Sequence, residues 1–431
     1  MQQNHLPHVA DYFNLDQEEK IRKAIKRINQ MIAERKRLLS QARVVNIHQY
    51  NQENTSKEPN VFILIDNYDA LKDSEFGEKI ETFFNRVTRE GLALGIHLIL
   101  TASRVNAIKS SVYINIKTKI SLFLYDSNEL TSVIGSSKHG VKDIKGRAVL
   151  NDDNFTHFQI AQPYQLTNNQ RLNDLIEKEI QAMIEHFDGN LPKAIPMMLD
   201  NVKETDVLKS ADLEQLLLEK HRLPLGLDYE DVEPVTLDLS RPSIITGSSP
   251  PELERLNLHI LEYLNQYKTQ HTVILLDAEG NMSEQSHLVS SYYSEESDLK
   301  MMRQGFKTEI DKRRNDETRA ASTQLVIINN LKLYVENAGL TEQEIMMILN
   351  EGPKFNIHII ITGFYNDLFN SYLRQVKLAN QLINQAVIIS RLYDQNFVPT
   401  TNASKEPPLK KGDMYYFSNY DYKKIKLIDK E

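Results

Sequence analysis

An apolar run at residues 61–65, Val-Phe-Ile-Leu-Ile, leads directly into Asp66. A continuous apolar run of this length is typical of a strand that is buried on both faces, as in a parallel sheet. A second run, residues 95–100, ends in small hydroxyl residues up to Ser103, and residues 78–94 between the two runs have apolar positions at helical spacing. The pattern predicts a strand, a helix and a second strand. Asp66 is then expected at the carboxyl edge of the sheet, where open α/β sheets bind ligands.

The same pattern returns in the second half of the chain. Residues 325–330 repeat the first run, and residues 356–363 repeat the second. The polar end of the first strand and the histidine of the second are 31 positions apart in one copy and 29 in the other. A third landmark, residues 145–150, has its counterpart at residues 411–416. Three landmarks in one order predict two copies of one domain.

The rest of the pattern predicts the elements around these strands. Residues 16–39 are expected to form a helix that begins after Asp16 as N-cap and carries an apolar stripe. Its other face is basic and is interpreted as a solvated face, with a phosphate-binding surface as the alternative. Residues 119–124 are expected to form a strand, and 146–150 with 155–160 an antiparallel pair. The predicted domains are 1–163 and 206–431, joined by a helical and extended linker, 164–205.

Composition narrows the class of protein. The chain is 41% hydrophobic and 26% charged, which is ordinary for a globular protein, and its net charge of −8 makes a nucleic-acid partner unexpected. It has no cysteine, so disulfides and thiolate metal sites are excluded and a reducing compartment is expected. No apolar run approaches the roughly 20 residues that a membrane span needs. The histidines form no metal-binding pattern, and His5 and His8 are interpreted as ordinary polar residues.

Several segments, taken in order, resemble the FtsK/SpoIIIE class of P-loop ATPases. More closely, they resemble the C-terminal part of the EssC/EccC ATPases of type VII secretion systems. Besides the two apolar runs, the segments that carry the resemblance are residues 6–8, 45–47, 50–51, 94–100, 194–197 and 223–228. The resemblance implies an α/β fold of two RecA-like P-loop ATPase-type domains, with mainly parallel central sheets and antiparallel closing strands. The first domain is expected to lack its N-terminal part.

The second domain differs from this family at both parts of the nucleotide site, the phosphate loop and the magnesium-binding strand end. A phosphate loop is expected where the strand at 243–247 turns into a helix, and a working loop needs a lysine and a hydroxyl residue. Counting from Gly247, the second glycine, the lysine and the hydroxyl residue are replaced by Glu252, Leu253 and Glu254. The acidic pair that would hold magnesium is replaced by Asn329 and Asn330. The domain is therefore expected not to hydrolyse ATP.

The first domain departs in a different way. No GxxxxGK[ST] motif precedes Asp66, and the resemblance places the family's phosphate loop before Met1. Asp66 matches the metal-coordinating carboxylate, and it would hold magnesium only if the missing part is supplied; the alternative is a capping carboxylate. The catalytic carboxylate is replaced by Asn67, an amide that cannot accept a proton from water. Ser103 stands where the family commonly has glutamine, and Leu92 where it often has arginine.

The resulting hypothesis is a catalytically degenerate, EssC-like module of a type VII secretion motor. Its expected roles are substrate recognition and regulation or assembly of the motor. No cofactor is expected in this chain, whereas intact family members use ATP and Mg²⁺. The expected partners are other domains or subunits of a ring-like ATPase and the C-terminal tails of secreted proteins. The expected location is the cytoplasm, at the cytoplasmic face of the cell membrane.

Two alternatives stay open: a fragment of an FtsK-type DNA-translocating ATPase, and a free-standing scaffold or inhibitor of an intact motor. For substrate binding, a groove that accepts an amphipathic helix is expected. Five tyrosines are candidate anchors in such a groove, with packing in the core as the alternative interpretation for each of them: Tyr292, Tyr293, Tyr334, Tyr415 and Tyr416.

Overall fold

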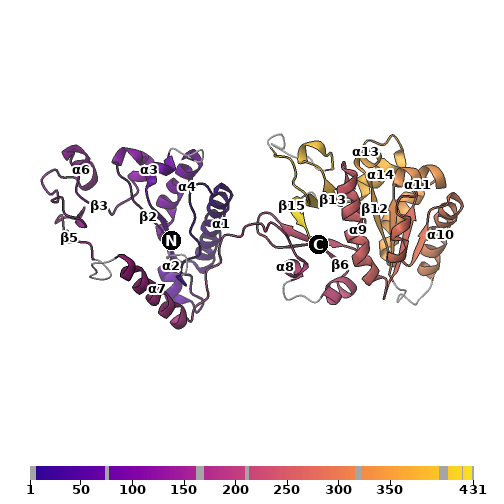
Figure 1. The fold of residues 1–431 in the computed structure, drawn as a ribbon, viewed down its shortest axis with the longest axis horizontal. Coiled ribbons are helices and arrows are strands. Elements are labelled where there is room, and N and C mark those ends of the chain that lie inside the picture. The colour runs from indigo at the N-terminus through magenta and orange to yellow at the C-terminus, as the bar shows by residue number, and fades with distance from the viewer. Residues whose placement is uncertain are drawn as a thin grey trace. The chain divides into compact units, whose positions relative to one another are not determined.

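The chain forms two compact units, Met1–Ile195 and Pro196–Glu431 (Figure 1). The structure is a computed structural model that describes residues 6–72, 77–161, 169–208, 213–315, 323–397, 406–419 and 421–429. The predicted linker, 164–205, spans the division between the units. Its described part contains α7 (Asn169–His186) and the first residues of α8 (Glu204–Leu208).

Unit 1 is centred on two parallel strands, β1 (Val61–Ile65) and β2 (Ile96–Leu100), connected through α4 (Gly77–Glu90). The apolar side of α4 packs against one face of these strands, as its helical spacing predicts. The other face is uncovered, with Phe62 57% and Leu64 71% exposed. The prediction that this strand is buried on both faces is therefore wrong. In the described part of unit 1, the sheet has only two strands and helices pack on one side of it.

Helix α1 (Glu18–Ala42) corrects two further predictions. It begins after Gln17 without a side-chain cap, so Asp16 is not its N-cap. Its basic face is not fully solvated either, because Lys23 and Arg35 are buried. The Arg35 guanidinium donates hydrogen bonds of 2.7 Å to two backbone carbonyls, those of Leu94 and Pro59, at the approaches to β2 and β1.

A small antiparallel sheet follows in unit 1. The predicted pair is confirmed as β4 (Arg147–Leu150) and β5 (His157–Gln159), while the predicted strand at 119–124 is confined to β3 (Ile120–Ser121). Other short helices of the unit are α2 (Ile47–Glu53), α3 (Tyr68–Lys72), α5 (Ser110–Tyr113) and α6 (Ser127–Ile134).

Unit 2 contains a ten-stranded sheet in the order β10-β9-β11-β12-β8-β13-β14-β15-β6-β7. The first six strands are parallel and the remaining pairings are antiparallel, as the predicted closing strands require. In chain order the strands are β6 (Arg222–Asp228), β7 (Pro234–Asp238), β8 (Ser243–Gly247), β9 (Thr272–Asp277), β10 (Ser291–Tyr293), β11 (Gln324–Asn329), β12 (Ile357–Phe364), β13 (Gln385–Ile389), β14 (Asp413–Ser418) and β15 (Asp421–Leu427).

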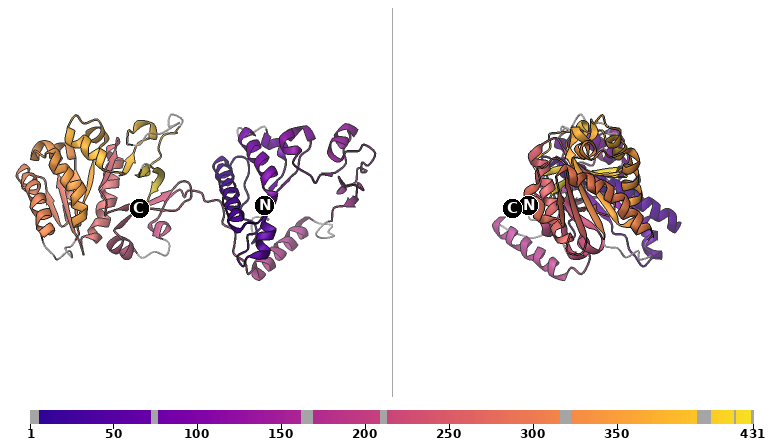
Figure 2. Two further views of the ribbon diagram at one scale, coloured as in Figure 1. Left: turned by 180° about the vertical axis from the view of Figure 1, so that it is seen from behind. Right: turned by 90° about the vertical axis from the view of Figure 1, so that its right-hand side faces the viewer.

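Helices cover both faces of this sheet (Figures 1 and 2). On one face, α9 (Pro250–Tyr267) packs through Leu256, Ile260 and Leu264. The other face is covered by α10 (Glu296–Asn315), α11 (Leu331–Ala338), α12 (Glu342–Met346), α13 (Tyr365–Phe369) and α14 (Arg374–Leu382). This double cover explains why the central strands are continuous apolar runs, since both of their faces are removed from water.

The strand pairing confirms the internal repeat. Phe62 pairs with His97 in unit 1, and Leu325 pairs with His358 in unit 2, so the two copies share one register. Asn67 and Asn330 occupy corresponding positions in this register, and both have a left-handed backbone, with φ of 60° and 62°. In each unit the third landmark contains a strand with an antiparallel partner on either side, β4 between β3 and β5, and β14 between β13 and β15.

Candidate functional site

In unit 2, the turn between β8 and α9 is the segment for which the sequence predicts a phosphate loop. Only Ser248 and Ser249 separate Gly247, at the end of β8, from Pro250, the first residue of α9. Strand packing by itself favours glycine at position 247, because a Cβ there would lie 3.1 Å from the Cβ of Ile389 on the neighbouring strand.

The first turn of α9 has few groups that attract an anion. Helix N-termini bind phosphate through backbone N–H groups that have no partner within the helix. Pro250 and Pro251 occupy the first two positions of α9 and carry no N–H, and the next residue, Glu252, is negatively charged. Leu253, at the position of the family's lysine, is 4% exposed and belongs to the core that α9 forms with the sheet.

Asn329, at the end of β11, is held by a buried carboxylate that the sequence reasoning missed. Its side-chain nitrogen donates hydrogen bonds of 2.7 Å to Asp277 and to Asn281. Asp277 ends the neighbouring strand β9, is 0% exposed, and also accepts bonds from the Tyr292 hydroxyl and from two backbone N–H groups of the following turn. The signal available in the sequence was a third apolar run ending in an aspartate.

Asn330 has a different role, as N-cap of α11. Its side-chain oxygen accepts a 3.1 Å hydrogen bond from the Leu333 N–H, while its nitrogen lies 3.3 Å from a Glu279 oxygen and 3.4 Å from an Asp367 oxygen. Lys332 forms an ion pair with Asp367, which raises the pKa of the lysine. The two asparagines therefore act as hydrogen-bond donors to carboxylates.

In unit 1 the predicted residues meet at the carboxyl edge of β1 and β2. The Thr101 hydroxyl donates a 2.7 Å hydrogen bond to Asp66 and accepts one of 2.9 Å from the Asn67 N–H. The Ser103 N–H donates to Asp69, and this bond lowers the pKa of the Asp69 carboxyl. All of these side chains except that of Asp69 are exposed. Sequence reasoning missed Asp69, which follows Asp66 by one helical turn.

The remaining predicted residues lie apart from this edge. Leu92 is 70% exposed on a short 3₁₀ turn before β2. Of the candidate aromatic anchors, Tyr334 and Tyr415 are core residues, at 0% and 4% exposed, as the alternative interpretation expects. Tyr292, Tyr293 and Tyr416 are half-buried.

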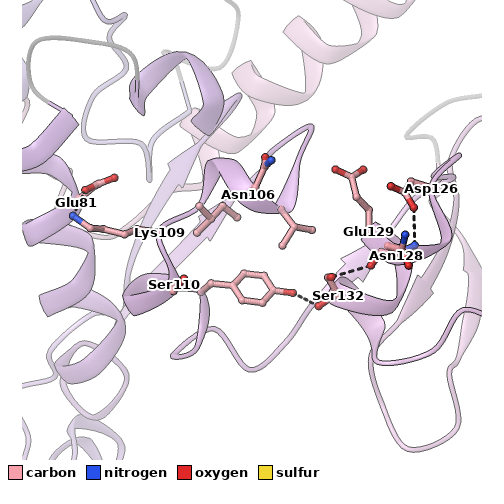
Figure 3. A pocket seen from close by; sticks show the side chains of 11 residues that line it. Glu81, Asn106, Lys109, Ser110, Asp126, Asn128, Glu129 and Ser132 are labelled. Atoms are coloured by element: carbon pink, nitrogen blue, oxygen red, sulfur yellow. Dashed lines mark hydrogen bonds and ion pairs between the residues drawn. The ribbon is translucent and has the colours of Figure 1, made fainter.

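Unit 1 also contains a groove of about 760 Å³ that none of the predicted site residues line (Figure 3). It lies between the segment 105–113 and α6, and its walls include three carboxylates, Glu81, Asp126 and Glu129. Lys109 forms an ion pair of 2.6 Å with Glu81 across one end of it. The groove is formed by the packing of a loop against a short helix. Periodic patterns in the sequence do not predict such packing.

Comparison with known proteins identifies the class of protein to which the chain belongs. Residues 1–151 match the model of the FtsK/SpoIIIE family. The structure of EssC (ATPases 2 and 3) from Geobacillus thermodenitrificans superposes with a TM-score of 0.80 at 25% identity, over 99% of this chain and 82% of that chain. Residues 1–151 thus form an FtsK/SpoIIIE-type segment, and the chain has the RecA-like P-loop ATPase fold, as the sequence predicts.

The more particular resemblance is confirmed as well. The type VII secretion system protein EssC of Staphylococcus aureus (strain MRSA252) is 51% identical over 424 residues, which is 98% of this chain and 29% of that protein. The ESX secretion system protein YukB of Bacillus subtilis is 26% identical over 444 residues, again 98% of this chain and 29% of that protein. The chain is therefore EssC-like and spans less than a third of these relatives.

The structure of a third related protein has the same fold. The structure of Thermomonospora curvata EccC (ATPases 2 and 3), in complex with a signal sequence peptide, has a TM-score of 0.52 at 15% identity and covers 100% of this chain and 80% of that chain. Within the described residues, no helix has the length and apolar character to cross a membrane. The same residues contain no group of three or more histidine and acidic side chains placed to hold a metal ion.

Proposed function

We propose that the chain is a module of a type VII secretion motor that does not hydrolyse ATP and acts in substrate recognition and in regulation or assembly of the motor. Its similarity to EssC supports membership of such a motor. The observation that carries the loss of hydrolysis is the turn from β8 to α9. This turn connects a strand to a helix, as a phosphate loop does. It has two prolines and Glu252 at positions where a triphosphate needs N–H donors and positive charge.

The metal side of unit 2 supports the same proposal. Magnesium is held by carboxylate oxygens and substrate phosphates in ATPases. Here Asn329 supplies an amide whose nitrogen is already committed to Asp277 and Asn281, and Asn330 caps α11. These residues do not fit Mg²⁺ and ATP, and we derive no hydrolytic step from them.

Unit 1 is proposed to keep only a remnant of a nucleotide site. Asp66 is exposed at the sheet edge and is available as a magnesium ligand if a further segment supplies a phosphate loop. Asn67 beside it cannot serve as a general base, because an amide does not accept a proton from water near neutral pH. The described residues around Asp66 also include no lysine or arginine hydrogen-bonded to it.

The test is calorimetry of the chain with ATP and Mg²⁺, together with a phosphate-release assay. We expect neither binding nor hydrolysis, and an intact FtsK/SpoIIIE-type ATPase is the positive control. Binding that disappears in Asp66→Ala would place a nucleotide site in unit 1. Hydrolysis lost in the same variant would make the chain an enzyme, which contradicts the proposal.

Substrate recognition is proposed by analogy with the EccC structure, which contains a signal sequence peptide. The proposed partners of this chain are the C-terminal tails of secreted proteins and the other domains or subunits of a ring-like ATPase at the cytoplasmic face of the membrane. Fluorescence anisotropy with a labelled C-terminal tail peptide of a secreted substrate tests this. We expect saturable binding that is unchanged by ATP, and a scrambled peptide is the control.

Two other outcomes would favour the alternative functions. Affinity for duplex DNA that falls linearly with the logarithm of salt concentration would support a DNA-translocating ATPase. Inhibition of an intact secretion ATPase by the added chain, without any binding of tail peptides, would support a scaffold or inhibitor. The net charge of −8 is the observation against the first of these.

A further inference from the structure

Unit 2 contains a group of histidines near the end of α9. His271 immediately precedes β9, His221 immediately precedes β6, and His358 is the second residue of β12. The ring centroid of His271 lies 4.2 Å from that of Tyr267, the last residue of α9, and 5.2 Å from that of His221. Tyr267 is fully buried, and its hydroxyl oxygen lies 2.7 Å from Nδ1 of His221. His221 and His271 are therefore close enough for a charge on one to act on the other.

The two ring nitrogens of His271 have different surroundings. Nε2 lies 3.3 Å from the backbone carbonyl oxygen of Leu218, which belongs to the π-helix η4 (Gln215–Glu219). Because a carbonyl oxygen can only accept, Nε2 carries the hydrogen of the neutral ring. Nδ1 is buried and has no hydrogen-bond partner among the described residues. A proton gained by His271 would therefore be placed on an atom that has no acceptor in this conformation.

Burial opposes a positive charge on both histidines. It lowers the pKa of His271, and the bond to the Leu218 carbonyl opposes that shift. Burial also lowers the pKa of His221, and the neighbouring His271 lowers it further. The folded conformation of this region thus favours two neutral rings.

Other charged groups face these rings from β6, β7, β12 and α10. Asp238 of β7 favours a positive charge on His221, but its carboxylate lies 3.2 Å from Nη2 of Arg222 of β6 and is already engaged in an ion pair. On His358 of β12, a positive charge is disfavoured by His221 and by Arg313 of α10. Charging the histidines therefore adds positive groups to a region where the nearby carboxylate has a partner.

Residues 215–221 form the segment that this arrangement holds against α9. Leu217 and Leu218 are 0% and 5% exposed and belong to the core that α9 forms with the sheet. His221 is the last residue of this segment, and His271 lies in the loop that follows α9. Positive charges on both rings would repel each other across the contact between the segment and that loop.

We propose that His271 and His221 form a pH-sensitive latch, in which gain of a proton by His271, beside the positive charge of His221, releases residues 215–221 from the end of α9. The latch is closed when both rings are neutral. Release gives Nδ1 of His271 access to water and exposes Leu217 and Leu218. This inference goes beyond the proposed function, because it concerns a conformational change within unit 2 and does not involve nucleotide or substrate.

The direction of the pH dependence follows from the lowered pKa values. Both histidines have folded pKa values below the ordinary 6.5. Their contribution to closing is therefore complete above pH 6.5 and is lost as pH falls through the folded values.

The test is amide hydrogen exchange of the whole chain at pH 7.5 and at pH 5.0, with rates corrected for the intrinsic effect of pH on exchange. A pH of about 5.0 lies below the ordinary pKa of histidine and above that of carboxyl groups. We expect protection of residues 215–221 to fall about tenfold or more between the two pH values, and to fall more than that of β11. Equal loss of protection in both segments would indicate global unfolding and would overturn the inference.

Two variants test the assignment to these histidines. His271→Gln keeps an N–H donor for the Leu218 carbonyl but cannot gain a proton, so the fall in protection of residues 215–221 should shrink to within about twofold. His221→Gln removes the neighbouring charge and should reduce the fall to about threefold. Each variant is compared with itself at the two pH values, so a change in basal stability does not affect the result.

The matched control is His287→Gln, the same exchange at an exposed histidine of unit 2. It should leave the tenfold fall unchanged. A fall in His271→Gln as large as in the unmodified chain would overturn the inference. If His271→Gln does not fold at pH 7.5, an undiminished fall in His221→Gln would overturn it instead. Binding or hydrolysis of ATP, or binding of tail peptides, has no bearing on these outcomes, so this inference and the proposed function fail separately.

Discussion

A single side-chain amide decides the chemistry at the end of β11. The Asn329 nitrogen lies 2.7 Å from an oxygen of Asp277, and both residues are buried. A donor at this position satisfies a carboxylate that has left water, whereas an acceptor would leave two negative groups facing each other at hydrogen-bond distance. The amide is therefore matched to its neighbour as well as unsuited to magnesium.

Asn329→Asp is expected to destabilise unit 2 by about 2–4 kcal/mol, because it buries a carboxylate against Asp277. Urea unfolding followed by tyrosine fluorescence and circular dichroism measures this change. The control is Asn67→Asp, the same exchange at an exposed strand end of unit 1, where we expect a change within about 0.5 kcal/mol. Equal midpoints for Asn329→Asp and the unmodified chain would contradict the account of this network.

His358 is expected to make stability depend on pH. It is 6% exposed, its Nδ1 has no hydrogen-bond partner among the described residues, and burial lowers its pKa from 6.5 to about 4. Because the folded pKa lies below the unfolded one, the stabilisation is complete above pH 6.5 and is lost as pH falls towards 4. The loss amounts to at most about 3 kcal/mol.

The measurement for His358 is the free energy of unfolding between pH 4 and 7. His358→Leu should flatten this dependence, although burial lowers the pKa of the nearby His221 and His271 too, so part of the slope remains. His97→Leu, at the equivalent position of unit 1, is the control and should leave the slope of unit 2 unchanged, because it lies outside that unit. A slope identical in His358→Leu and in the unmodified chain would count against this assignment.

At the scale of elements, α1 is fixed to the central strands by one guanidinium group. Arg35 is 3% exposed, and its two terminal nitrogens donate to the carbonyls of Leu94 and Pro59 and to the carboxylate of Glu58. Burial lowers the pKa of Arg35, and the carboxylate of Glu58 opposes that shift. A buried arginine with several acceptors positions a helix more precisely than apolar contacts alone.

Arg35→Ala is expected to destabilise unit 1 by about 2–4 kcal/mol, because it removes the hydrogen-bond donor of two backbone carbonyls and opens a cavity. Amide hydrogen exchange at β1 and β2 should rise with it. Arg37→Ala, two residues further along the same helix and exposed, is the control and should change stability by less than about 0.5 kcal/mol. Unchanged exchange at β1 and β2 in Arg35→Ala would show that α1 is held by its apolar contacts.

Sequence periodicity located the central strands but did not show which residues and elements lie next to them. The apolar runs predicted the strands and their repeat, since burial in a parallel sheet leaves a local trace. The pattern alone did not reveal the bare face of β1, because β1 is as apolar as β11, whose residues are buried. Likewise, Asp277 and Asn329 are 52 positions apart, and only the pairing of β9 with β11 brings them together.

At the scale of the whole chain, the two units differ in completeness. The sheet of unit 2 has helices on both faces and antiparallel strands that close one side. The described sheet of β1 and β2 has two strands and one bare face. Because stability depends on the area removed from water, unit 2 should fold independently of its neighbour.

Residues 196–431 expressed alone are therefore expected to unfold cooperatively in urea, at the midpoint that unit 2 shows in the full chain. Hydrogen exchange at β8, β11 and β12 should be equally slow in both. Residues 1–195 expressed alone are the comparison and should unfold at lower urea concentration. A large loss of protection in the isolated residues 196–431 would show that unit 2 depends on contacts with the rest of the chain.

The pairing of Asp277 with Asn329 also restricts which residues position 329 can accept. A carboxylate at position 329 is compatible with the surrounding core only if position 277 gives up its own charge in the same step. No single exchange at 329 can satisfy both conditions. A carboxylate at this strand end would therefore need a second change at position 277, even though asparagine and aspartate differ in a single heavy atom.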